Sequence, residues 1–223
     1  MSLFKDIVKL WNSDDLLSQA WDESYDMMVL SNEIFTKAIG YLQNNEDLQA
    51  IRALKKRDAE INLFQKNVRR KVVTHYAISR DIENLPSGLV LLNMVVDVER
   101  VGDYTKNILD LALNYPGTMI AEDFSKELAE IENEVASRFE KTINAINSQD
   151  EDVAKSLMKT YKDIVSISDA IVNGCISGEI SQGSENKCVS LALYARYLKR
   201  IAAHLKNIST ILVNPFEAVG YKK

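Results

Sequence analysis

Apolar residues recur along the chain at the spacing of amphipathic helices. Over residues 14–43, a stripe that repeats every seven residues comprises Trp21, Met28, Phe35 and Leu42. Over residues 48–79, a second stripe comprises Ile51, Leu54, Ile61, Val68 and Val72. Residues at these spacings lie on one side of a helix. Each segment is therefore predicted to be a helix that packs against a core with one face.

Four further helices are predicted over residues 87–114, 121–147, 151–173 and 184–213. Pro86 favours a helix start, because proline fits the first helical turn. Pro116 and Gly117 end the third helix, and glycines at 174, 178 and 183 predict the longest loop. The 223 residues include only 8 Gly and 3 Pro, and a many-stranded β fold would need more of this turn punctuation.

The second half of the chain repeats the first. Residues 100–101 and 106–108 read Arg-Val and Lys-Asn-Ile, and residues 200–201 and 206–208 read Arg-Ile and Lys-Asn-Ile. Matching element lengths and order favour a duplication, and short connections force neighbouring helices to reverse. The sequence therefore predicts an all-α fold of two tandem three-helix bundles laid end to end, residues 1–116 and 117–223.

Charge and cysteine content narrow the class of protein. The net charge is −5, whereas a nucleic-acid binder usually presents a basic face. Basic clusters at residues 55–57 and 69–71 are interpreted as solvated helix faces, with a docking surface for an acidic partner as the alternative. The most apolar uncharged run, residues 85–96, is too short to cross a bilayer. Since no signal peptide is recognised, Cys175 and Cys188 are expected to be free thiols in a cytoplasmic protein.

Oxygen ligands interrupt the apolar faces of two predicted helices. Glu99 and Asp103 lie four residues apart and share a face of the third helix, and Asp58 and Asn62 have the same spacing on the second. Burying an unpaired carboxylate is costly. A cation would offset that cost, and oxygen-rich sites favour hard or borderline metals. The alternative is ordinary ion pairing, because basic residues such as Arg100 are at hand.

The two histidines do not complete a catalytic site. His75 continues the stripe after Val72, and His204 stands where Tyr104 stands in the first half. Both are interpreted as packing or hydrogen-bonding residues. A di-metal oxidase in a helical bundle would use Glu-x-x-His pairs, and neither histidine has Glu three residues before it. The chain also lacks a nucleophile elbow and a phosphate-binding glycine loop, so it is predicted not to be an enzyme.

Residues 97–104 form the most distinctive motif, Asp-Val-Glu-Arg-Val-Gly-Asp-Tyr, with Asn107 and Ile108 following. It resembles the signature of the PhoU family of phosphate-regulatory proteins, which is close to Asp-Leu-Glu-Arg-Ile-Gly-Asp-Tyr-Ala-x-Asn-Ile. Residues 58–62 resemble the family's weaker Asp-x-x-Val/Ile-Asn/Asp pattern. The family also consists of two repeated three-helix bundles, so the resemblance covers nearly the whole chain.

The resemblance implies a metal site in the first repeat. In the family, Glu/Asp-x-x-x-Asp pairs are associated with metal clusters, reported with iron or zinc among others. The corresponding ligands here would be Asp58, Asn62, Glu99 and Asp103. Arg100 and Lys106 would orient the carboxylates or balance their charge.

The second repeat departs from this pattern. Lys199 and Ala203 occupy the positions of Glu99 and Asp103. The fifth helix offers Tyr161 and Asp163 where the oxygen pair would be expected, with Val165 in the place of Asn62. A protonated lysine has no lone pair to offer a cation. A metal ion or small cluster is therefore expected in the first repeat only.

The resemblance also implies a function. PhoU-like proteins are linked to repression of phosphate-starvation signalling and to control of phosphate uptake, through contact with a phosphate transporter and a membrane histidine kinase. The chain is expected to be such an adaptor, a homodimer that reaches the membrane only through its partners. The alternatives are a metal-free helical scaffold and an accessory protein of another transporter.

Overall fold

The computed structural model describes residues 15–44, 47–79, 82–115, 125–179 and 185–221. Long helices account for most of them: α2 (Leu16–Asn44), α3 (Leu48–Lys56), α4 (Asp58–Ser79), α5 (Leu85–Asn114), α6 (Ser125–Ser148), α7 (Glu151–Ser177) and α8 (Glu185–Val213). A short 3₁₀ helix, η1 (Phe216–Ala218), follows. The described ranges contain no strand, so the all-α prediction is confirmed.

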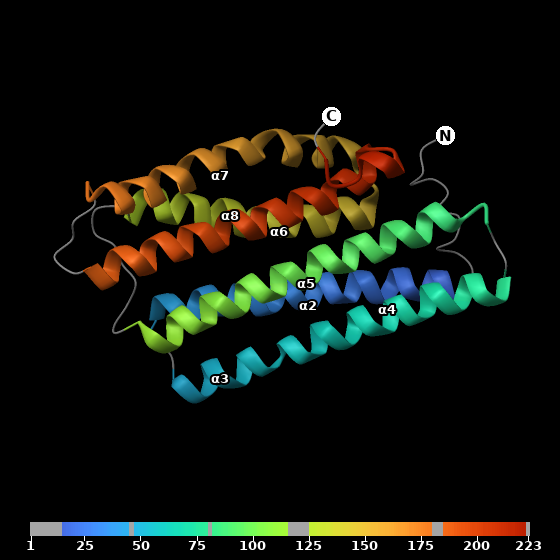
Figure 1. Ribbon diagram of the computed structural model, residues 1–223, viewed down its shortest axis with the longest axis horizontal. Helices are drawn as coiled ribbons and strands as arrows, with labels where there is room; N and C mark the ends of the chain where they lie inside the picture. The colour runs from blue at the N-terminus through green and yellow to red at the C-terminus, as the bar shows by residue number, and fades with distance from the viewer. Residues whose placement is uncertain (1–14, 45–46, 80–81, 116–124, 180–184, 222–223) are drawn as a thin grey trace.

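The two three-helix bundles lie side by side (Figure 1). The first contains α2, α5 and the broken helix α3–α4, and the second contains α6, α7 and α8. The bundles contact each other where α5 packs on α8 and α2 packs on α6. The expected end-to-end arrangement is therefore wrong. Packing along the length of the helices buries more apolar surface than contact between bundle ends, and burial of that surface drives folding.

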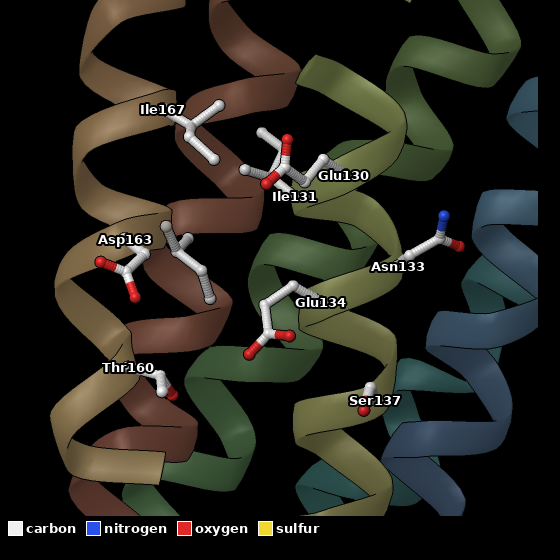
Figure 2. A pocket seen from close by; sticks show the side chains of 9 residues that line it. Glu130, Ile131, Asn133, Glu134, Ser137, Thr160, Asp163 and Ile167 are labelled. Carbon is white, nitrogen blue, oxygen red and sulfur yellow. The ribbon is translucent and has the colours of Figure 1, made fainter. Parts of the chain in front are cut away.

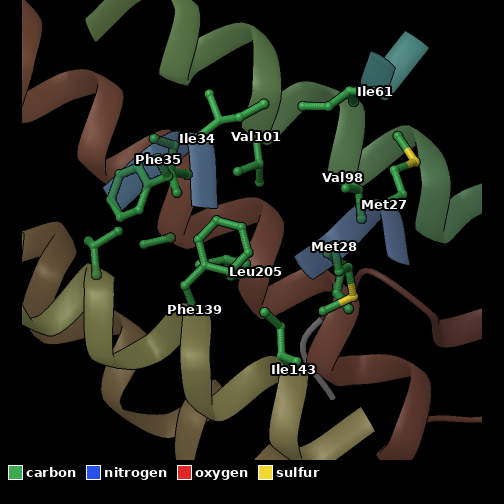
Figure 3. Close-up of a cluster of buried hydrophobic side chains, with 14 of the residues drawn as sticks. Met27, Met28, Ile34, Phe35, Ile61, Val98, Val101, Phe139, Ile143 and Leu205 are labelled. Atoms are coloured by element: carbon green, nitrogen blue, oxygen red, sulfur yellow. The ribbon is translucent and has the colours of Figure 1, made fainter. Parts of the chain in front are cut away.

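A single hydrophobic core extends through both bundles. Phe35 on α2 and Phe139 on α6 lie at its centre, with ring centroids 5.7 Å apart. Figure 3 shows these rings beside Val101 of α5 and Leu205 of α8. Each bundle thus completes the core of the other.

Corresponding helices of the two repeats have matching patterns of buried residues. Residues 91–109 of α5 and 191–209 of α8 have the same burial class at every position. The buried residues of α2 from Ser24 to Leu42 recur at corresponding positions of α6 from Leu128 to Ile146. The repeat that a few shared residues indicated therefore holds in three dimensions.

Two predicted helix bounds are wrong. The helix expected over residues 48–79 breaks at Arg57, whose N–H donates to the carbonyl of Leu54 at 3.0 Å, a tight i to i−3 turn. The helix expected to end at residue 173 continues through the buried Gly174 to Ser177. Its C-cap is Gly178, with a φ of 77°, a left-handed conformation that glycine adopts without strain. The bundle boundary predicted between residues 116 and 117 lies outside the described residues.

Candidate functional site

The structure brings the four predicted ligands together where α5 crosses α4. Gly102 allows this close approach. A Cβ atom added there would lie 3.0 Å from Cδ1 of Ile61 and 3.7 Å from Oδ1 of Asp58. Because glycine has no Cβ, the side chains of Ile61 and Asp58 on α4 can lie directly against the backbone of α5 here. The glycine of the motif thus leaves room for the Asp58 side chain of α4 beside α5.

Lys106 lies at the centre of this cluster. Its Nζ donates to Oδ2 of Asp58 at 2.9 Å and to Oδ1 of Asp103 at 3.2 Å. Asn62 also donates, from Nδ2 to Oδ2 of Asp58, at 3.1 Å. Burial acts to lower the pKa of Lys106, but these two carboxylates outweigh it and raise that pKa. The ammonium therefore remains charged and joins α4 to α5.

Arg100 pairs with Asp103 and Glu99 from the solvent side. Its Nη1 donates to Oδ2 of Asp103 at 3.0 Å, and its Nε lies 3.7 Å from Oε2 of Glu99. The pKa of Glu99 is raised, first by burial and then by the charges of Asp103 and Asp58, while Arg100 opposes the rise. Glu99 is thus the carboxylate of the cluster whose negative charge is least well compensated.

The side chains as placed do not form a metal site. Among the described residues, no group of three or more His, Cys, Asp or Glu side chains is arranged to hold a metal ion. The ligand types suit a hard or borderline cation, but oxygens of Asp58 and Asp103 already accept from Lys106. A metal that used these oxygens would have to displace the ammonium.

The second repeat has a different arrangement at the corresponding position. Lys199, the counterpart of Glu99, donates to Oδ1 of Asp169 at 2.6 Å. Lys206, the counterpart of Lys106, donates to the carbonyl of Gly220 at 2.9 Å. Within the residues that the structure describes, the first repeat thus has this carboxylate cluster and the second has lysine contacts in its place.

The motif and the duplication agree with the comparison with known families. The PhoU domain matches the chain twice, over residues 25–112 and 128–212. The chain belongs to the PhoU-domain family. The two PhoU domains include most of α2 to α5 and of α6 to α8, respectively.

Solved structures of PhoU proteins have the same fold. The crystal structure of PhoU from Pseudomonas aeruginosa has 18% sequence identity and a TM-score of 0.77, covering 89% of this chain and 95% of that chain. The phosphate transport system regulatory protein PhoU from Streptococcus pneumoniae has 20% identity and a TM-score of 0.77, covering 88% of this chain and 93% of that chain. No curated protein shows significant sequence similarity.

The basic clusters on the first PhoU domain make ion pairs within the domain. Lys55 pairs with Asp110, and Lys71 Nζ lies 3.2 Å from Oε1 of Glu23. These clusters were interpreted as solvated helix faces. The structure adds that Lys55 and Lys71 also pair with carboxylates of neighbouring helices. Separately, none of the helices in the described ranges combines the length and apolar character that a membrane span requires.

A polar junction between the two PhoU domains was not predicted. Asp97 on α5 accepts from Asn207 Nδ2 at 3.2 Å and lies 2.7 Å from His204 Nδ1. The ring of His204 also stacks on Tyr104, with centroids 5.9 Å apart. The interpretation of His204 as a packing and hydrogen-bonding residue is confirmed. His75 is likewise buried, with its ring edge-on to Tyr76.

A second unpredicted feature is a cavity of about 580 Å³ between α6 and α7. Figure 2 shows the carboxylate of Glu134 reaching from α6 toward α7, which carries Thr160 and Asp163. Beside the cavity lies Arg138, whose side chain is 0% exposed. The burial of Arg138 could have been predicted from the sequence, because this residue falls on the buried stripe of α6 at the position that Ile34 has on α2.

Proposed function

We propose that this protein is a regulatory adaptor of phosphate uptake and phosphate-starvation signalling. It acts by contact with a phosphate transporter, a membrane sensor kinase or both, and it performs no turnover. The observation that supports this most is the double PhoU-domain match over both bundles. The name of the Streptococcus pneumoniae relative, a regulatory protein of the phosphate transport system, points the same way.

A phosphate-starvation reporter in the native host tests this proposal. Deletion of the gene is expected to activate the reporter in phosphate-rich medium, and the intact gene supplied in trans is expected to restore repression. A pull-down from native membranes is expected to recover a transporter or kinase component. A reporter that ignores the deletion would contradict the proposal and favour an accessory protein of another transporter.

We also propose that the first repeat binds iron or zinc through Asp58, Asn62, Glu99 and Asp103. The support is the concentration of carboxylates around Glu99, which burial and neighbouring charge leave poorly compensated. Binding would require Lys106 to swing away from Asp58 and Asp103. The second repeat, with lysine at the position of Glu99, would bind none.

Elemental mass spectrometry of protein purified without a metal-binding tag tests the metal proposal. The parent is expected to retain metal, and the double variant Glu99→Ala with Asp103→Ala is expected to lose it. Lys106→Met is expected to raise the metal content, because the competing ammonium is gone. Equal content in the parent and the double variant, or none in either, would leave a metal-free helical scaffold.

The proposed adaptor is a cytoplasmic homodimer. Exposed apolar side chains on α4, Leu63 and Val73 among them, offer surface for such an association. Light scattering coupled to size-exclusion chromatography is expected to give twice the mass of the 25.2 kDa chain. A mass of one chain would contradict the dimer and leave the adaptor function open.

A further inference from the structure

The two cysteines of the chain lie against each other at one end of the second PhoU domain. Cys175 is in the last turn of α7 and Cys188 is in the first turn of α8, two helices that pack together. The Sγ atom of Cys188 donates to the carbonyl of Cys175 at 3.9 Å, and the two thiols are hydrogen-bonded to each other. The 223 residues contain no other cysteine. The fold thus brings all the thiols of the chain into one contact.

Both thiols are accessible to a small reagent. Cys175 and Cys188 are half-buried, and each packs with one part of its side chain against the edge of the core. The residues that follow them, Ile176 and Val189, are 78% and 59% exposed, so this end of the bundle faces solvent. A cysteine that served only as a buried apolar side chain would be inert. These two thiols combine mutual contact with access, which are the conditions for disulfide chemistry.

The two thiols differ as nucleophiles. Burial, followed by the hydrogen bond with Cys188 and its charge, raises the pKa of Cys175 to about 12, while the backbone N–H of Ala192 acts to lower it. The thiolate is the species that attacks a disulfide, and Cys175 forms little thiolate near neutral pH. Cys188 is therefore the first nucleophile. Once Cys188 has reacted, its thiol no longer raises the pKa of Cys175, so the second thiol ionises more readily.

We propose that Cys175 and Cys188 form a reversible disulfide by exchange with a low-molecular-weight disulfide of the glutathione type. The thiolate of Cys188 attacks one sulfur of the small disulfide, and one small thiolate leaves. The thiolate of Cys175 then attacks Sγ of Cys188 in the mixed disulfide, and the second small thiolate leaves. The protons of the two protein thiols end on the two released thiols. The protein thus loses two electrons, and the small disulfide gains them.

The bond would join the end of α7 to the start of α8. Its two residues are 13 positions apart in sequence, so in the unfolded chain it would close a loop. A cross-link of this kind restricts the unfolded chain more than the folded protein, in which the two thiols already touch. Oxidation would therefore stabilise the second PhoU domain. In a reducing compartment such a bond is transient and follows the redox state, so the thiol pair is a redox-sensitive link.

Intact-mass spectrometry of the full-length protein, equilibrated with mixtures of reduced and oxidised glutathione, tests this inference. Thiols that remain after an acid quench are alkylated with a maleimide. The folded protein is expected to change from two alkylated thiols to none, as a monomer that lacks two hydrogens, and excess reduced glutathione is expected to reverse the change. Because folding holds the thiols together, the equilibrium constant for the bond is expected to be at least about tenfold larger in buffer than in concentrated urea. Two bound glutathionyl groups, a disulfide-linked dimer as the only product, or equal constants in buffer and urea overturns the inference.

Three variants test the contact and the order of attack. Cys175→Ser is expected to retain one glutathionyl group on Cys188, and Cys188→Ser is expected to react at least about tenfold more slowly, because Cys175 is poorly ionised. Equal rates overturn the assignment of Cys188 as the first nucleophile. The control, Cys188→Ala with Val189→Cys, moves the thiol by one position to a side chain that is 59% exposed, and it is expected not to bond to Cys175. A bond that forms in this control as readily as in the parent overturns the role of the observed contact.

Thermal unfolding shows whether the native fold accommodates the bond. The oxidised parent is expected to unfold at a midpoint about 5–10 °C above that of the reduced parent, the range expected for a loop of this size in a chain of this length. Oxidised glutathione is expected to produce no such rise in Cys175→Ser, which cannot close the loop. A midpoint that the bond leaves unchanged or lowers overturns the inference.

Discussion

Glu132 is a buried carboxylate at the contact between the two bundles. It lies on α6 at the position that Met28 occupies on α2. Its Oε1 accepts from Gln43 Nε2 and its Oε2 accepts from Tyr194 Oη, both at 2.5 Å. Burial raises the pKa of Glu132, although the two hydrogen bonds act to lower it. Folding therefore favours the protonated form of this side chain.

The raised pKa predicts a pH dependence of stability. Between the ordinary pKa of 4.5 and the higher value in the folded state, the folded protein holds a proton that the unfolded chain has lost. The free energy of unfolding therefore falls as the pH rises through that window. Urea unfolding between pH 4 and pH 8 is expected to show this fall weakened in Glu132→Gln and unchanged in the exposed control Glu140→Gln. Parallel profiles for parent and Glu132→Gln would contradict it.

At the residue scale, sequence reasoning found the oxygen cluster but not its arrangement. Glu99 and Asp103 were recognisable because two carboxylates one helical turn apart interrupt an apolar stripe. The bridge from Lys106 to Asp58 joins residues 48 positions apart, and helical spacing contains no information about such a contact. The oxygen cluster and a charge-balancing role for Lys106 were thus predictable, but the bridge that Lys106 makes between Asp58 of α4 and Asp103 of α5 was not.

Among the helices, α7 shows a start specified by a local signal. Asp150 is its N-cap, and its Oδ1 accepts from the N–H groups of Asp152 and Val153 at 3.0 and 2.9 Å. These donors have no partner within the helix. The carboxylate also favours the positive end of the helix dipole. The start of α7 at residue 151 was predictable for this reason.

Removal of this cap is expected to destabilise the protein. Asp150→Ala should lower the free energy of unfolding by about 1 kcal/mol, because two backbone donors lose their acceptor. The measurement is chemical denaturation followed by far-UV circular dichroism. Asp152→Ala is the control, since its side chain is 95% exposed and makes no capping bond in the described structure. Equal stability of the Asp150 variant and the parent would show that water replaces the cap without cost.

The helix ends that were not predicted depend on other elements. No proline or glycine lies next to the break at Arg57, so the sequence does not indicate it. The guanidinium of Arg57 pairs with Glu33 of α2, a contact between helices. Gly174 looked like a helix breaker, but it is buried within α7. A glycine costs a helix only about 1 kcal/mol, so a helix of this length can continue through it.

At the scale of the whole molecule, the shared core makes the two bundles one folding unit. Phe35 and Phe139 contact each other across the boundary, and Asp97 on α5 bonds to His204 and Asn207 on α8. Either bundle alone would expose the apolar face that the other covers. Unfolding is therefore expected to be cooperative across both repeats.

Calorimetry of the Phe139→Ala variant tests this cooperativity. The substitution should destabilise the protein by about 3–5 kcal/mol, the usual range for deleting a buried phenylalanine ring. It is expected to lower the midpoint of a single transition that includes both repeats. Two resolved transitions, with only one of them shifted, would show that the repeats fold independently.

The sequence alone determined that the chain is helical, that it is duplicated and that it carries the PhoU motif. These properties are local or periodic, since amphipathic spacing and a short motif can be recognised without knowing which helices meet. The tertiary structure decided that the bundles lie side by side, that Lys106 bridges Asp58 and Asp103 between α4 and α5, and that a cavity opens beside Thr160. Each of these depends on contacts between helices, such as that between Asp97 and His204, 107 positions apart. Which side chains contact each other depends on how several helices pack together. The residue pattern of a single helix does not determine these contacts.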